Sequence, residues 1–244
     1  MALSFNDALV KYNQHLQTAG KANATIVAYT KDVEQLIKYV VEQGRTDVAQ
    51  VDYEDVKQFK ELLKKRRYTN KSISRKINSI KSFFRYLKNQ GEAESNPAGE
   101  ISHPKIEQKP PRYLSKLEYR ALRDACRGDA RMAAIVELLL QSGMRISELA
   151  NLKMDDIDLE REVMFIRAQK SREGRKVPVN TAAKEALMDY LKVRPKAKES
   201  TVFLTKTCRP FLVRNIRSAI NRYFGLAGTK DATVNDLRNT FIVE

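Results

Sequence analysis

The stretch QSGMRISELANL at positions 141–152, followed by DDID at 155–158, decides how this chain folds. The residues before it, 132–140, are nearly all apolar, which predicts a buried helix that ends at Gly143. The residues after it predict one or two more helical turns. Arg145 lies between the two, so its backbone is fixed by the end of a buried helix and its side chain is well placed to line a cleft.

Arg145 and a second arginine far downstream, Arg238, are candidates for binding one phosphate. The planar guanidinium donates paired hydrogen bonds to phosphate oxygens and stays charged at every working pH. Glu148, one helical turn after Arg145, could orient that guanidinium or anchor the site. The alternative is an exposed Arg–Glu pair, which contributes almost nothing to stability. Spacing alone does not decide between the two.

The chain of 244 residues is strongly basic, with 45 Lys and Arg against 30 Asp and Glu, a net charge of +15 and a pI of about 9.7. This charge attracts polyanions, and we expect nucleic acid in preference to an acidic membrane surface. No apolar run is long enough for a bilayer, and no signal-peptide pattern opens the chain. Cys126, Cys208 and two histidines form neither a zinc motif nor a disulfide framework, which favours a cytosolic, metal-independent protein.

Residues 1–100 predict a small bundle of four amphipathic helices, because apolar residues recur at helical spacing in four segments. The expected first residues of these helices are Ser4, Thr25, Asp52 and Ser72. Three of the helices are expected to stop at Gly20, Gly44 and Gly91.

A dense group of basic residues lies at the end of the third predicted helix and along the fourth. Its members on and beside the fourth helix are Lys71, Arg75, Lys76, Lys81 and Arg85. On so basic a chain, this face predicts contacts with DNA phosphates. The alternative is a solvated surface whose charges favour the helix C-termini.

Prolines between positions 97 and 111 break any helix and favour extended chain. We therefore place a linker at 101–112, between a first domain at 1–100 and a second at 113–244. The second domain mixes helices with two strands that form a predicted hairpin. The strands are expected at 163–166 and 176–179, and the helices at 115–127, 132–140, 146–152, 181–193, 212–224 and from 236 onward.

The connection between the two predicted strands is polar and basic. Lys170 lies on it and, with a lowered pKa, could donate a proton to a leaving oxygen. The alternative treats the same loop as a DNA-backbone contact, since Arg172 and Arg175 lie beside this lysine. Arg214 and Arg217 form a further basic face, on the outer side of the helix at 212–224, which we expect near the major groove together with the fourth helix.

The order of these features resembles the tyrosine recombinase (phage integrase) family. The segment GMRISEL at 143–149 resembles the first arginine motif of that family, and Lys170 stands at the position of its hairpin lysine. The segment NDLRNTF at 235–241 resembles the second arginine motif, which usually reads His-x-x-Arg-His-Thr-Phe. The resemblance covers essentially the whole chain. It implies a mainly α protein with a helical core-binding domain, a linker and an α+β catalytic domain.

The resemblance also implies site-specific breakage and rejoining of double-stranded DNA through a 3′-phosphotyrosine, with no cofactor and no small-molecule substrate. In that chemistry Arg145 and Arg238 clamp the scissile phosphate. Lys170 assists the leaving 5′ oxygen, and Glu148 supports the site. Copies of the protein are expected to assemble on DNA in a bacterial cytoplasm, at the nucleoid and without membrane contact.

The sequence departs from the family pattern at the second motif. Asn235 replaces the usual histidine, and its amide can hydrogen-bond a phosphate oxygen but cannot exchange a proton near neutral pH. Asn239 replaces a second common histidine. The family's nucleophilic tyrosine has no counterpart, because Tyr223, the tyrosine nearest to Arg238, precedes the motif. We therefore expect this chain alone not to cleave DNA.

Two explanations of these departures stay open. The sequence ends within a predicted helix, which favours a piece of a longer recombinase that lacks the nucleophile segment. The two asparagines favour a relative that binds DNA, has lost cleavage, and acts as a repressor or accessory factor. A third hypothesis, a basic RNA- or membrane-binding protein, leaves the ordered series of arginines and lysine unexplained.

Overall fold

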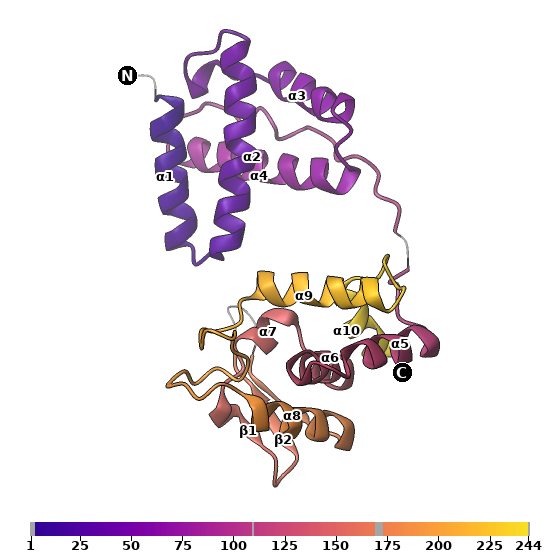
Figure 1. Ribbon diagram of the computed structural model, residues 1–244. Coiled ribbons are helices and arrows are strands. Elements are labelled where there is room, and N and C mark those ends of the chain that lie inside the picture. The colour runs from indigo at the N-terminus through magenta and orange to yellow at the C-terminus, as the bar shows by residue number, and fades with distance from the viewer. Residues whose placement is uncertain (1–2, 109, 169–172, 244) are drawn as a thin grey trace. The chain divides into compact units, whose positions relative to one another are not determined.

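The chain divides into two units, Met1–Gln108 and Lys109–Glu244 (Figure 1). The structure is a computed structural model that describes residues 3–108, 110–168 and 173–243. Helices dominate both units, and the second unit adds a small antiparallel sheet. The predicted fold class, mainly α with an α+β second half, is confirmed. Across the described ranges, no helix has both the length and the apolar character needed to cross a membrane.

The first unit is a bundle of four helices, as predicted. They are α1 (Phe5–Thr18), α2 (Asn23–Glu42), α3 (Tyr53–Lys65) and α4 (Asn70–Asn89), with a 3-10 turn, η1 (Val48–Gln50), before α3. Helix α4 packs against the other three, so its apolar face forms the centre of the core. Phe83 and Phe84 on α4 are almost fully buried there, and Tyr12 of α1 meets Phe83 edge to face.

The helices begin at residues that can cap them. Ser4 and Asp52 accept the hydrogen bonds expected of N-caps at α1 and α3. Helix α4 begins earlier than predicted, because Thr69 is its cap and accepts a bond of 3.2 Å from the backbone N–H of Ser72. The residue expected to open the helix is thus the third residue inside it.

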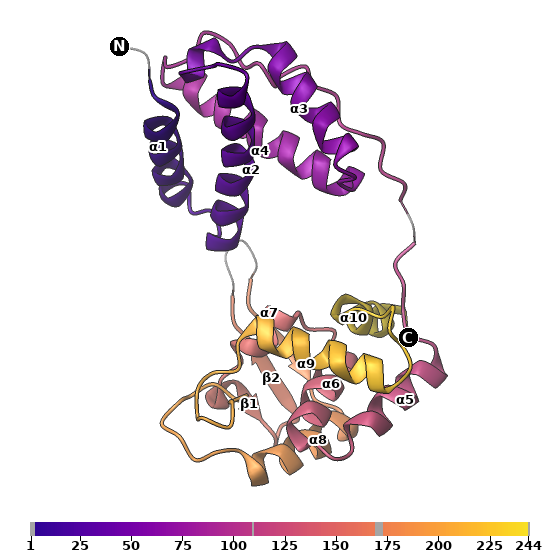
Figure 2. The same ribbon diagram turned by 45° about the horizontal axis from the view of Figure 1, so that its top comes forward.

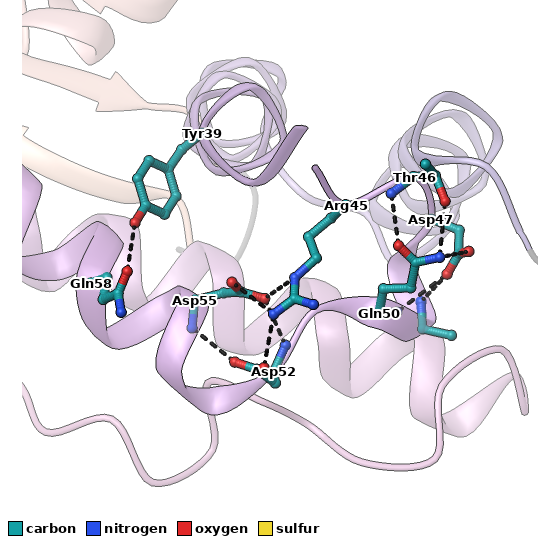
Figure 3. Close-up of polar contacts among 9 residues, drawn as sticks. Tyr39, Arg45, Thr46, Asp47, Gln50, Asp52, Asp55 and Gln58 are labelled. Carbon is teal, nitrogen blue, oxygen red and sulfur yellow. Dashed lines mark hydrogen bonds and ion pairs between the residues drawn. The ribbon is translucent and has the colours of Figure 1, made fainter. Parts of the chain in front are cut away.

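Arg45 joins the end of α2 to the start of α3 (Figure 3). Its guanidinium donates to Asp55 at 2.9 and 3.2 Å and to Asp52 at 2.9 Å. The two aspartates also cap each other's backbone, so three charged side chains close one capping box. A separate bond of 3.2 Å from Tyr39 to Gln58 holds the two helices side by side further along. These contacts fix the direction of α3, whose far end carries basic residues.

A buried carboxylate joins α2 to α4. Asp32 is 1% exposed and accepts hydrogen bonds from Arg75, from Lys76 at 2.8 Å and from Ser79 at 2.9 Å. Lys76 also donates to Gln35 at 2.6 Å. Two cations and a hydroxyl therefore satisfy one anion inside the bundle, which is the condition under which a buried charge is tolerated.

The predicted DNA contact by Lys76 is wrong. Its side chain is only 6% exposed and its ammonium is bound within the bundle, so it cannot reach a phosphate. The helical spacing of the sequence already indicated that this position is buried. Lys76 lies three residues after Ile73 and four before Ile80, both buried, and so it shares their apolar face. Arg75, by contrast, keeps 46% of its side chain exposed while it holds Asp32.

Removing the anion should destabilise the first unit more than removing the buried cation. We expect Asp32→Ala to cost about 3–5 kcal/mol, because it leaves the Lys76 ammonium buried without its charge partner. We expect Lys76→Met to cost roughly 1 kcal/mol, because Arg75 and Ser79 still satisfy the carboxylate. Urea unfolding followed by far-ultraviolet circular dichroism measures both. Equal losses for the two variants would contradict this account of the cluster.

The stretch expected as a linker, 101–112, is divided between the two units. Ile101 is buried in the core of the first unit. Lys60 donates to the backbone carbonyl of Ser102 at 2.8 Å, and Asn70 donates to that of Lys105 at 2.8 Å. Residues 101–105 therefore lie on α3 and α4 as part of the first unit, because these side chains satisfy the extended backbone.

The second unit is built around α6 (Ala130–Ser142), the buried helix predicted from its apolar run. The other helices that contact it are α5 (Lys116–Cys126), α7 (Ile146–Ala150), α8 (Thr181–Val193), α9 (Val213–Leu226) and α10 (Val234–Val243). Both ribbon views show α6 between α8 on one side and α9 on the other (Figures 1 and 2). Because α6 is enclosed, its C-terminal end is held rigidly.

A three-stranded antiparallel sheet completes the second unit. Its strands are β1 (Ile157–Asp158), β2 (Val163–Ile166) and β3 (Arg175–Pro178), in the order β1-β2-β3, and the 3-10 turn η2 (Met154–Asp156) leads into it. The predicted hairpin is β2–β3, which pairs Val163 with Pro178 and Ile166 with Arg175. The short strand β1 was not predicted. This pairing places Arg175 at the first position of β3. From there its side chain reaches Glu148, in the motif at 143–149.

Candidate phosphate-binding site

The site begins at the sharp turn between α6 and α7. Gly143 ends α6 with φ at +55°, the left-handed region that favours glycine. Arg145 is the N-cap of α7, and its backbone N–H donates to the Glu148 carboxylate at 2.9 Å. The first turn of α7 therefore closes on itself and fixes the Arg145 backbone.

Glu148 is the anchor of this turn. It is 4% exposed, and Arg175 of β3 donates to both its carboxylate oxygens, at 3.1 and 2.8 Å. The Arg145 guanidinium lies 3.4 Å away and still has 38% of its side chain exposed. Arg145 thus keeps donors for a ligand while Glu148 holds it. The pair is a built part of the site and not an exposed surface ion pair.

The Glu148 carboxyl is held in its charged form. Burial alone would raise its pKa, but the hydrogen bonds from Arg175 and from the Arg145 backbone outweigh it, and the charges of both arginines add to them. The pKa of Glu148 is lowered to about 2 as a result. The hydrogen bond to Glu148, together with the charge of that carboxylate, outweighs the effect of burial on its partner and raises the pKa of Arg175.

The stability of the second unit should fall in acid through this carboxyl. The folded pKa is about 2 against 4.5 for a free glutamate, so the stabilisation is complete above about pH 4.5 and is lost as the pH falls towards 2. A shift of this size corresponds to roughly 3 kcal/mol. Urea unfolding between pH 2 and 6 measures it. Glu148→Gln, which does not titrate, should show a correspondingly flatter dependence, and a variant curve parallel to that of the wild type would refute the assignment.

Arg238, on α10, reaches the same turn from the other side. Its guanidinium donates to the backbone carbonyl of Gly143, two residues before Arg145. Phe241, one turn further along α10, lies so close to Gly143 that a Cβ there would overlap its ring. Gly143 therefore has two reasons to be glycine, its positive φ and the packing of α10. The two arginines named from the sequence converge on one backbone turn.

Adding one methyl group at this turn should displace α10. We expect Gly143→Ala to cost on the order of 3 kcal/mol, from left-handed backbone strain and from overlap with Phe241. Gly128→Ala is the matched control, because Gly128 has no atom within 4 Å of an added Cβ and no positive φ. Urea unfolding of the two variants makes the comparison. Equal stabilities would show that α10 does not pack on Gly143 as described.

Helix α10 is also held by the chain that enters the second unit. Asn239 donates to the backbone carbonyl of Arg112 at 2.9 Å, and Thr240 accepts from the backbone N–H of Leu114 at 2.9 Å. The Arg112 guanidinium lies 3.8 Å from Asp236. The amide nitrogen of Asn239, at the position of a common family histidine, is thus bound to backbone. No feature of the sequence alone pointed to this role.

Comparison with known proteins identifies the fold. The model of the phage integrase family matches residues 112–244, and that of the phage integrase N-terminal SAM-like domain matches residues 9–91. The chain belongs to the phage integrase family. The predicted resemblance is therefore confirmed in both halves of the chain.

Relatives within the phage integrase family align with most of this chain. The tyrosine recombinase XerC of Oceanobacillus iheyensis is 31% identical over 249 residues, which cover 96% of this chain and 80% of that protein. The crystal structure of the XerA recombinase is 26% identical and covers 97% of this chain and 82% of its own, with a TM-score of 0.52. A lambda integrase dimer bound to a COC′ core site covers 98% and 88%, with a TM-score of 0.79 at 15% identity, and shows a shared fold.

The residues that the phage integrase motifs point to are partly brought together. Arg145, Glu148 and Arg238 surround the end of α6. Asn235 is exposed on the first turn of α10, three residues before Arg238. Lys170 lies outside the described residues, so its predicted role stays a prediction.

The predicted DNA contacts differ in their surroundings. Those with exposed side chains are Lys71, Arg75, Arg85, Arg214 and Arg217. Lys81 is half-buried, and Arg172 lies outside the described residues. Arg175 was grouped with the DNA contacts, but its guanidinium is bound to Glu148, and it acts as an anchor of the site. Sequence reasoning missed this role, because strand pairing alone brings the two residues together.

Proposed function

We propose that this protein binds a specific double-stranded DNA site and takes part in breaking and rejoining it, as a site-specific recombinase. The observation that supports this most directly is the convergence of Arg145 and Arg238 on the turn at Gly143 in a chain of net charge +15. The XerC relative, named as a tyrosine recombinase, supports the same activity. Work on DNA would place the protein in the cytoplasm, at the nucleoid.

In this proposal the two arginines hold one phosphate between them. Arg145 and Arg238 donate to its non-bridging oxygens, and their charges stabilise the extra negative charge that builds up as the phosphorus is attacked. Glu148 and Arg175 do not touch the DNA. They keep the Arg145 backbone and side chain in place, so that little reorganisation is needed when the phosphate binds.

The remaining roles follow from the family resemblance. Lys170, on the connection between β2 and β3, would assist the leaving 5′ oxygen. Exposed cations on α4 and α9 would hold the duplex through its phosphates. Several copies of the chain would assemble on one DNA site, as the lambda integrase dimer on its core site suggests. The proposed reaction involves no small-molecule substrate and no membrane.

The first test is DNA binding and its dependence on salt. A duplex that the protein binds is first selected from a random-sequence pool. The affinity for this duplex is then measured between about 50 and 200 mM salt. Over this range, a protein that makes about 6–10 phosphate contacts loses roughly 10³–10⁵-fold in affinity. We expect a loss of that order for the wild type, seen as a steep slope of log affinity against log salt concentration. Arg145→Gln and Arg238→Gln should each lower affinity and make the slope shallower by about one contact. A wild-type slope near zero would rule out the proposal.

A second candidate function, a DNA-binding regulator without cleavage activity, is favoured by one observation. Asn235 stands exposed where the family usually has a histidine, and an amide cannot transfer a proton near neutral pH. The two functions separate on a nicked duplex of the selected site, incubated with the product of the natural gene. A covalent protein–DNA product excludes the regulator, whereas tight, specific binding without any covalent product excludes the recombinase.

A further inference from the structure

A pocket of about 440 Å³ lies between α9 and the start of α10. The residues that matter for its chemistry are Arg217, Asn221, Lys230, Asp231, Thr233 and Asn235. It has room for on the order of ten water molecules, each occupying about 30 Å³. A charged group larger than a simple ion can therefore enter it.

The cations of this pocket have no partner among the residues that the structure describes. Arg217 and Lys230 are exposed, and within the described ranges no side chain forms a hydrogen bond or ion pair with either. This distinguishes them from Arg75 and Arg175, which hold the buried carboxylates Asp32 and Glu148. Arg75 and Arg175 thus serve the fold, whereas the pocket presents its donors to an external ligand.

The chemistry of the lining favours an anion. Lysine and arginine side chains donate hydrogen bonds and accept none, and the amides of Asn221 and Asn235 add neutral donors. Asp231 is the one carboxylate among the lining residues, so two cations leave a surplus positive charge. A phosphate needs only donors and positive charge.

The pocket also lies close to the site of Arg238. Asn235 lines it and precedes Arg238 by three residues on α10, which is about 4.5 Å along a helix. Successive phosphates of one DNA strand are separated by about 3.4 Å along the duplex axis. A strand whose phosphate lies at Arg238 would bring a neighbouring phosphate to this pocket.

We propose that this pocket binds a second backbone phosphate of the DNA, next to the one held by Arg145 and Arg238. The inference rests on the proposed function and adds a site to it. Arg217 and Lys230 would contact the neighbouring phosphate and thereby fix the register of the strand. They are positioning residues for the phosphate that reacts, because a strand held at two successive phosphates cannot slide along the site.

The test measures salt slopes for single-charge variants of the whole chain. Lys230→Gln and Arg217→Gln should each reduce the slope by about 0.9, the value for one lost phosphate contact, and should weaken binding equally on the selected duplex and on a scrambled one. Asp231→Asn should strengthen binding, because it removes the only negative charge of the lining. Circular dichroism checks that the exposed substitutions leave the fold intact.

Lys192→Gln is the matched control. It removes the same charge from an exposed lysine on α8, which packs on α6 on the side away from α9 in both views (Figures 1 and 2). Its slope should equal that of the wild type. Equal effects of Lys230→Gln and Lys192→Gln would overturn the inference, and so would an effect of Lys230→Gln on the selected sequence alone. A wild type that binds without salt dependence would instead refute the proposed function itself.

Discussion

The second unit depends on one buried carboxylate. Glu148 closes the first turn of α7, binds Arg175 of β3 through both oxygens, and holds the guanidinium of Arg145. A charge so enclosed is tolerated because its hydrogen-bond partners are cations and a backbone N–H. The ligand-facing arginine and the hairpin are therefore tied to the same anion. Under the proposed function, stability and phosphate binding therefore have a common origin at this point.

Much of this arrangement could be predicted from the sequence, because local patterns encode it. The apolar run of α6 predicted a buried helix, and its glycine end predicted a fixed turn at Arg145. The helical periodicity of residues 1–100 predicted four packed helices. The ordered motifs around Arg145 and Arg238 predicted the family, because the same residues in the same order require a shared fold.

What the sequence could not reveal are contacts between residues distant in the chain. Arg175 was taken for a DNA contact, since its basic neighbours gave no sign that strand pairing would aim it at Glu148. The close packing of Phe241 against Gly143 likewise depends on how α10 packs. Lys76 is different, because its position between Ile73 and Ile80 already placed it on the buried face. Charge outweighed periodicity in that prediction, and periodicity was the better guide.

The bond between Leu114 and Thr240 joins positions 126 residues apart. A contact that closes so long a loop forms late when a chain folds. On the ribosome, the first unit can fold while α10 is still being synthesised. The turn at Gly143 would then lack its contact with Arg238 until α10 has been synthesised. A nascent chain would thus be unable to grip nucleic acid with both arginines before its second unit is completely translated.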